Sequence, residues 1–201
     1  MRTAVCISGL LRSWDIIKLN NLNNIIKDSD VFYVTDLELN IPNINNTTSA
    51  ENQNFYSAED IDFFQSRKAG ETNIENCLNM FYKIYQCNNL KKQFEQKNNF
   101  KYDVCIRLRT DTHFDREILL EDIQENTLYI SEDKGYGGIC DQFSYGNSNV
   151  MDRYSDVFCN IRTYVAEGCT FHPETLLKYH SDKQEFLYKY IGNNFFNIIR
   201  T

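Results

Sequence analysis

The first 36 residues carry the pattern that most restricts the fold of this chain. Thr3–Ser8 is a continuous apolar run rich in small and β-branched residues, and it stops at a Ser-Gly pair, as a buried strand entering a turn does. Residues 15–26 then place isoleucines and leucines at helical spacing, and residues 30–36 predict a second strand that ends in an acid. Strand, helix and strand within about 35 residues predict a βαβ unit with two parallel strands.

The rest of the chain alternates between the same two kinds of element. A capping box at Thr72–Glu75 precedes an apolar stripe with helical spacing, which predicts a long helix over residues 73–97. Residues 37–71 are polar and rich in Asn, and they predict a long loop with one short helical stretch at 58–66. Further expected elements are strands at residues 102–111, 127–131 and 142–145, and helices at residues 151–165 and 173–190. The alternation predicts a single α/β domain with a mostly parallel central sheet flanked by helices.

Composition and charge exclude several classes of protein. The net charge of −7 and the pI near 5.0 argue against nonspecific binding to nucleic acid or anionic membranes, because both depend on basic surface. The mean hydropathy of −0.52 and the lack of a long uncharged apolar run exclude a membrane-spanning helix. Seven Cys without a CxxC pair, and an N-terminus without a signal-peptide pattern, predict buried free thiols and a cytoplasmic location. Neither a GxSxG motif nor a cluster of Cys and His is present, so the sequence supports no serine hydrolase and no zinc site.

Small and charged residues follow three of the expected strands. They are Ser8, Gly9 and Arg12 after the first strand, Asp36 after the second, and Arg107, Arg109 and Asp111 at the end of the strand expected at 102–111. Ligands of open α/β sheets bind beyond the carboxyl ends of the strands, where Arg can hold phosphate and an acid can bind a divalent cation. The pattern therefore indicates a site for a phosphorylated ligand. Two plainer interpretations stay open, namely an internal Arg–Asp ion pair and an ordinary strand-to-helix turn after Ser8.

Four segments carry a resemblance to a known group of enzymes. They are Val5–Trp14, the RxRxD motif that ends Tyr102–Asp111, Asp141–Gly146 and His172–Glu174. In this order they resemble nucleotide-sugar glycosyltransferases of the GT-A type, the polysaccharide- and lipopolysaccharide-type enzymes of bacteria and large viruses. The resemblance runs from about residue 2 to about residue 180 and does not cover residues 37–71. Each motif is short, and their order carries the resemblance.

The resemblance implies a single GT-A-like, Rossmann-type domain. Residues of about 1–111 would bind the nucleotide, and residues of about 112–201 would shape the acceptor site. Asp111 would take the place of the acid in the family's DxD element, which helps to bind a divalent cation, Mn²⁺ or Mg²⁺, and the sugar diphosphate. The second residue after Asp111 is His113, so the motif here is DxH. A neutral imidazole can bind Mn²⁺, but an ordinary surface or core His is the alternative, and the departure leaves metal dependence open.

Three further charged residues are candidates for a role at the site. Asp141 follows the Gly-rich segment 135–138, which suits a lid, and a carboxylate there can deprotonate an acceptor hydroxyl. Glu174 is the second candidate for this role, although an acid in the first turn of a helix is also typical of capping. Lys83 on the long helix would add positive charge if it faced the site, and a solvated Lys is the alternative.

These observations favour a glycosyltransferase that moves a sugar from a nucleotide-diphosphate sugar to a hydroxyl of a glycan acceptor, assisted by a divalent cation. One alternative is a noncatalytic module that binds a nucleotide or glycan on the same fold, because the DxD element is incomplete. Another is a sugar-phosphate nucleotidyltransferase, although Ser8–Arg12 holds only one Gly and no Lys. Neither nucleic acid nor a transmembrane segment is expected.

Overall fold

The chain folds as alternating strands and helices in a computed structural model that describes residues 1–11, 15, 29–36, 46–49, 56–114, 120, 123–132, 137–192 and 196–199. The strands are β1 (Thr3–Gly9), β2 (Asp30–Thr35), β3 (Asn46–Ser49), β4 (Val104–Arg109), β5 (Thr112–His113), β6 (Thr127–Ser131), β7 (Phe143–Gly146), β8 (Leu187–Ile191) and β9 (Asn197–Ile198). The helices are α2 (Ala58–Gln65), α3 (Ile74–Asn98), α4 (Ser148–Ser155), the 3₁₀ helix η2 (Asp156–Asn160), α5 (Ile161–Ala166) and α6 (Pro173–Lys183).

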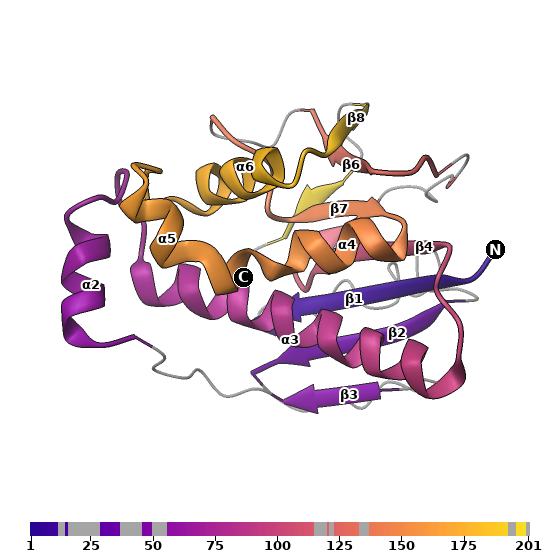
Figure 1. The fold of residues 1–201 in the computed structure, drawn as a ribbon. Coiled ribbons are helices and arrows are strands. Elements are labelled where there is room, and N and C mark those ends of the chain that lie inside the picture. The colour runs from indigo at the N-terminus through magenta and orange to yellow at the C-terminus, as the bar shows by residue number, and fades with distance from the viewer. Residues whose placement is uncertain are drawn as a thin grey trace.

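Seven of the described strands form one sheet in the order β3-β2-β1-β4-β7-β6-β8 (Figure 1). The first four are mutually parallel, β7 is antiparallel to both β4 and β6, and β8 is parallel to β6. The predicted α/β class and mostly parallel sheet are therefore confirmed. The chain adds β2 and β3 on one side of β1 and β4 on the other, so a topological switch point lies between β1 and β4. Such a switch point is where open α/β sheets bind ligands, at the carboxyl ends of the strands.

The sheet carries two apolar layers because side chains alternate along each strand. On β1, Ala4 and Cys6 face the layer that includes α3 and α4, whereas Val5 and Ile7 face the opposite layer. Ser8 has the same phase as Cys6, and it lies on the side of the sheet that α3 covers. In Figure 1, α3 and α4 run across this face of the sheet. Ser8, the polar residue near the end of β1, therefore lies beneath α3.

The strand predictions at the N-terminal side agree closely with the structure, and so does the long helix. Strands expected at residues 3–8 and 30–36 are β1 and β2, the strand at 102–111 is β4, and the helix at 73–97 is α3. The expected capping box at Thr72–Glu75 is wrong, because Asn73 is the N-cap of α3 and accepts a hydrogen bond from the backbone N–H of Asn76. The helix expected at residues 15–26 lies outside the described residues, apart from Asp15.

Two predicted helices differ from the structure at the C-terminal side. The helix expected at 151–165 is divided into α4 and α5 by the 3₁₀ helix η2. The helix expected at 173–190 ends at Lys183, and Glu185 takes a positive φ of 56°. The chain then forms β8, which pairs with β6 from Thr127 to Ser131. The free edge of β6 supplies backbone partners that the local helical spacing does not reveal, and this tertiary pairing decides the outcome.

The prediction of buried free thiols is confirmed for six of the seven Cys. All seven Cys are free, and all but Cys159 are buried. Among the described residues, no helix has both the length and the apolar character needed to cross a membrane.

Candidate functional site

Side-chain hydrogen bonds join the ends of β1, β2 and β4. The backbone N–H of Leu11 donates to Asp36 Oδ1 at 3.0 Å, which ties the turn after β1 to the end of β2. Thr110 Oγ1 donates to the carbonyl oxygen of Leu10 at 2.6 Å, which ties the same turn to the end of β4. The structure thus brings together three strand ends that the sequence predicts to meet. Arg12 lies outside the described residues.

Gly9 makes the turn after β1 possible. Its φ is +144°, a conformation that side chains with a Cβ rarely adopt, and a Cβ there would lie 2.8 Å from Thr110 Oγ1. The preceding residue, Ser8, is buried, and its hydroxyl has no hydrogen-bond partner in the described protein. The turn therefore leaves a buried hydroxyl without a described partner and a partly exposed stretch of backbone at the switch point.

Arg109 lies between two acids at the end of β4. Its guanidinium binds the Asp111 carboxylate through two hydrogen bonds, from Nε to Oδ1 at 2.5 Å and from Nη2 to Oδ2 at 2.9 Å. Its Nη1 lies 3.6 Å from Asp141 Oδ2. Burial alone would lower the pKa of Arg109, but the hydrogen bonds and the charge of Asp111 outweigh it, and the pKa is raised. The ion pair that the sequence left open as an alternative is thus present, and Asp141 joins it.

Backbone hydrogen bonds on both sides of Asp141 in the sequence fix its position. On one side, the backbone N–H of Arg109 donates to the carbonyl oxygen of Gln142 at 3.1 Å. On the other, the N–H of Ile139 donates to the carbonyl oxygen of Glu174 at 3.1 Å. A Cβ on Gly138 would lie 2.2 Å from that same Glu174 oxygen, so the chain packs tightly against the first turn of α6. The predicted lid is therefore firmly packed at Gly138, while Gly135 and Tyr136 lie outside the described residues.

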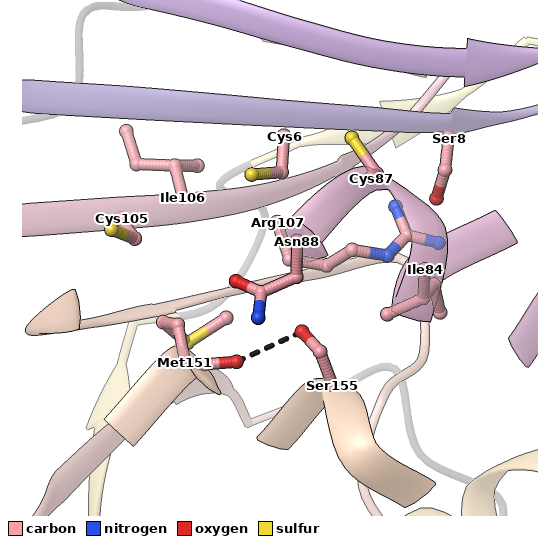
Figure 2. A pocket seen from close by; sticks show the side chains of 10 residues that line it. All are labelled: Cys6, Ser8, Ile84, Cys87, Asn88, Cys105, Ile106, Arg107, Met151 and Ser155. Carbon is pink, nitrogen blue, oxygen red and sulfur yellow. Dashed lines mark hydrogen bonds between the residues drawn. The ribbon is translucent and has the colours of Figure 1, made fainter. Parts of the chain in front are cut away.

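Arg107 is the most unusual residue of the site because its charge is buried without a partner. The residue is 2% exposed, and none of its three guanidinium nitrogens has a hydrogen-bond partner among the described residues. Figure 2 shows the guanidinium between Ser8 of β1 and Ile84 of α3. The cavity beside it has a volume of about 10 Å³, close to the space that one water molecule needs. Burial lowers the pKa of Arg107, and the nearby Tyr154 and Asp141 offset part of this effect.

Burial of a charge without a hydrogen-bond partner destabilises a protein by several kcal/mol, so Arg107 is a candidate for a role beyond stability. The neighbouring Tyr154 is itself fully buried, and burial raises the pKa of its phenol to about 12 although the charge of Arg107 opposes this. The two side chains come from β4 and α4, on the face of the sheet that α3 and α4 cover.

Lys83 is a second buried cation, and its placement corrects the interpretation of a solvated Lys. The residue is 2% exposed and belongs to the face of α3 that packs on the sheet. Cys87, one helical turn further on, donates to the carbonyl oxygens of Ile7 and Phe32, and Lys83 therefore lies one turn nearer the carboxyl ends of the strands. Burial lowers the pKa of Lys83, and the charge of Asp36 offsets part of this effect. The one available signal was its spacing of four from the apolar Cys87.

The predicted metal ligands do not form a complete metal-binding set. Among the described residues, no group of three or more His, Cys, Asp or Glu side chains is arranged to hold a metal ion. His113 is half-buried in β5, which pairs with β9 in a separate two-stranded sheet. Asp111 remains a suitable donor, because Mg²⁺ is usually held by one or two carboxylates together with phosphate oxygens and water. In this structure the Arg109 guanidinium forms an ion pair with the Asp111 carboxylate, so a positive charge is already bound there.

A groove of about 760 Å³ opens between the loop before α3 and the start of α6. Its walls include Asn73, Asn76, Met80, His172 and Thr175. Cys77 also lines it, and burial raises the pKa of this thiol, an effect to which the charge of Asp141 adds. Glu174 is buried in the first turn of α6, behind the groove wall.

Residues 1–157 match the family model of a domain of unknown function, DUF7796. This match spans more than three quarters of the chain. The chain belongs to the DUF7796 family. A comparison with curated proteins finds no match.

The DUF7796 match bears on the site through the residues that it spans. It includes Ser8, Gly9, Asp36, Lys83, Arg107, Arg109, Asp111, His113 and Asp141. It ends within η2, before α5 and α6, so Glu174 and the α6 side of the groove lie beyond it. The DUF7796 part of the chain therefore contains the whole cluster of charges at the switch point.

Proposed function

We propose that this DUF7796 protein is a glycosyltransferase with a GT-A-like domain, which transfers a sugar from a nucleotide-diphosphate sugar to a glycan hydroxyl. The observation that carries the proposal is the buried guanidinium of Arg107 beneath the β1–β4 switch point, which has no hydrogen-bond partner in the part of the chain that the structure describes. An anionic ligand at this edge would compensate the charge. Support also comes from Arg109, Asp111 and Asp141, which lie together at the same edge. A cytoplasmic location stays a prediction.

The cations at the switch point suit a diphosphate. The chain as a whole carries a net charge of −7, so an anion binds only where positive charge is concentrated. Arg107 on β4 and Lys83 on the sheet-facing side of α3 supply such charge, and the low dielectric around them strengthens their field. The backbone around Gly9 can donate to phosphate or ribose oxygens, and the buried Ser8 hydroxyl lines the small cavity beside Arg107. Asp36, at the end of β2, remains a candidate partner for ribose hydroxyls.

In the proposed reaction, Asp141 accepts the proton of the acceptor hydroxyl. The hydroxyl oxygen then forms a bond to the anomeric carbon while the bond from that carbon to the diphosphate breaks. Arg107 and Arg109 stabilise the negative charge that develops on the leaving diphosphate. A divalent cation held by Asp111 would supply further positive charge to the diphosphate. Support for this role comes from the Asp141 carboxylate, which lies 3.6 Å from Arg109, and from the chain before it, which packs against the first turn of α6 beside the groove.

The groove beside α6 is the proposed place for the acceptor. Asn73, Asn76 and Thr175 offer amide and hydroxyl groups, and Met80 offers an apolar surface. Glycans present the same mixture of hydroxyls and apolar faces. The groove draws on both parts of the chain, because residues from 69–80 line it together with residues from 172–175.

The bidentate ion pair of Arg109 with Asp111 favours a second candidate, a noncatalytic module that binds a nucleotide or glycan. In that case the pair fixes the end of β4 and takes no part in chemistry. Turnover separates the two candidates, because the module binds a nucleotide-sugar and releases no nucleoside diphosphate.

Asp111→Asn is expected to lower sugar transfer by at least about 100-fold while the fold is retained. The change removes the charge that holds Arg109 and that would hold a cation. A thermal-shift panel of UDP-, GDP-, dTDP- and CMP-linked sugars, with Mn²⁺ or Mg²⁺, first identifies the donor. A donor at about a hundred times its Kd stabilises the fold by about 2.7 kcal/mol, which raises the Tm by roughly 5–10 °C. Asp182→Asn on the exposed side of α6 is the matched control, and full activity of Asp111→Asn would contradict the assignment.

Asp141→Asn is expected to abolish transfer and, without a divalent cation, to leave donor binding within about threefold of the wild type, because Arg109 then stays on Asp111. Isothermal titration with the donor and a coupled assay of nucleoside diphosphate release measure the two effects separately. If binding and turnover fell together, Asp141 would belong to the donor site instead.

A further inference from the structure

Arg109 has two acidic partners and can fully bind only one of them. Both oxygens of Asp111 accept hydrogen bonds from it, whereas Nη1 lies 3.6 Å from Asp141 Oδ2, beyond hydrogen-bond distance. All three side chains are largely buried. The Asp141 carboxylate is therefore a second binding position for the guanidinium, and a small movement of the Arg109 side chain is enough to reach it.

The Asp111 carboxylate, to which Arg109 binds in this structure, is also the position predicted for a divalent cation. While Arg109 binds both oxygens of Asp111, a cation that approaches this carboxylate has to displace the guanidinium from at least one of them. Breaking a largely buried ion pair leaves a charge without compensation unless a new partner is at hand. Asp141 supplies part of that compensation, and the phosphate oxygens of a ligand would supply the rest, since guanidinium groups bind phosphate well.

We propose that Arg109 is a built-in counter-ion for Asp111, which occupies this carboxylate in the free protein and moves toward Asp141 and the diphosphate when a divalent cation binds. The proposal rests on the function proposed above. It has a direct consequence for the order of binding. The cation alone binds weakly because it competes with Arg109, and it binds tightly only together with a nucleoside diphosphate that gives Arg109 a new partner.

The test is the affinity for Mn²⁺ without nucleotide, measured by the electron paramagnetic resonance signal of free Mn²⁺. Arg109→Gln is expected to bind one Mn²⁺ at least tenfold more tightly than the wild type, because the competing cation is gone. The double variant Arg109→Gln, Asp111→Asn is expected to lose this gain. Arg162→Gln is the matched control, since Arg162 forms an ion pair with Asp60 at 2.6 Å, and it should leave the affinity unchanged. Circular dichroism checks that each variant is folded. Arg109→Lys keeps the charge but not the bidentate hydrogen bonding, so its Mn²⁺ affinity should lie between those of the wild type and Arg109→Gln.

Equal Mn²⁺ affinity of the wild type and Arg109→Gln would overturn the proposal, and so would a gain that survives in the double variant. A second arm repeats the titration with UDP or GDP, where the wild type should approach the affinity of Arg109→Gln. If Arg109→Gln gains Mn²⁺ but no form binds a nucleotide, the counter-ion role stands and the glycosyltransferase proposal fails. If the protein turns over nucleotide-sugar and Arg109→Gln has the same Mn²⁺ affinity as the wild type, the glycosyltransferase proposal stands and the counter-ion role fails.

Discussion

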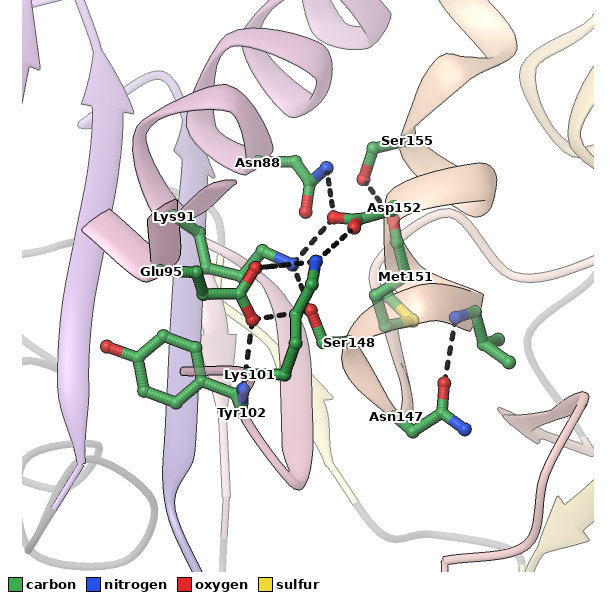
Figure 3. A network of polar contacts seen from close by, with 11 residues as sticks. Asn88, Lys91, Glu95, Lys101, Tyr102, Asn147, Ser148, Met151, Asp152 and Ser155 are labelled. Carbon is green, nitrogen blue, oxygen red and sulfur yellow. Dashed lines mark hydrogen bonds and ion pairs between the residues drawn. The ribbon is translucent and has the colours of Figure 1, made fainter. Parts of the chain in front are cut away.

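Lys91→Met is expected to lower the free energy of unfolding by about 3–5 kcal/mol, because it breaks a buried ion pair from one side. Lys91 is 0% exposed, and its Nζ donates to Ser148 Oγ and to Asp152 Oδ1, both at 2.6 Å (Figure 3). The same nitrogen lies 3.3 Å from Glu95 Oε2. These contacts join α3 to α4, so the network fixes the helix that also carries Lys83.

The expected loss of stability is large because the substitution leaves the buried carboxylate of Glu95 without the Lys91 charge. Its carboxylate accepts hydrogen bonds from the backbone N–H of Tyr102 at 2.9 Å and from Ser148 Oγ at 2.6 Å. Glu95 is 1% exposed, and after the substitution Lys101 is the one cation of the described residues that still pairs with it. The charge of Glu95 would then be poorly compensated in a site that excludes water. Met keeps most of the side-chain volume, so the expected loss reflects charge and not a cavity.

Chemical denaturation of the two proteins measures the difference, and the Tm should fall by roughly 10 °C. Lys101→Met is the matched control, because Lys101 contacts the same two acids but is 55% exposed. An exposed ion pair contributes about 0–1 kcal/mol. If the two variants lost equal stability, the buried position of Lys91 would not be what holds α3 and α4 together.

Lys91 also shows why the sequence predicts α3 but not its buried charges. The apolar stripe from Ile74 to Phe94 specifies the helix, since its spacing depends only on neighbouring residues. A Lys and a Glu four residues apart on a helix have the pattern of an exposed ion pair. Their burial is decided by α4 and by the loop before β4, which lie far away in the sequence. The same limit applies to Lys83.

The charge cluster at the switch point was predictable in part. Arg109 and Asp111 are close in sequence, and the end of a buried strand holds them at the sheet edge, so their proximity follows from local structure. Asp141 comes to the same place through the antiparallel pairing of β7 with β4, which no local pattern reveals. The absence of partners for Arg107 depends on residues from β1, α3 and α4 together, and only the packed structure shows it.

Arg107→Met is expected to raise the stability of the free protein by about 1–4 kcal/mol and to abolish the binding of nucleotide-sugar. The substitution replaces a buried charge that has no hydrogen-bond partner by an apolar side chain of similar length. The lining of the cavity suits this change, since Cys6, Ile84 and Met151 are apolar. Thermal denaturation without ligand and the thermal-shift panel with ligand measure the two effects on the same samples.

The sign of the stability change separates the two interpretations of Arg107. If the charge serves a ligand, its removal relieves a desolvation penalty in the free protein and removes the ligand-induced rise in Tm. If it is part of an internal ion-pair network with Asp141, its removal destabilises the fold, as removing one partner of a buried pair does. Arg153→Met shows the size of a structural effect, since Arg153 donates to the carbonyl oxygen of Gln184 at 3.0 Å and lies over the Phe186 ring. We expect Arg153→Met to lose stability and to keep donor binding, the reverse of Arg107→Met on both measurements. A destabilised Arg107→Met that still binds donor would instead assign Arg107 to the structural network.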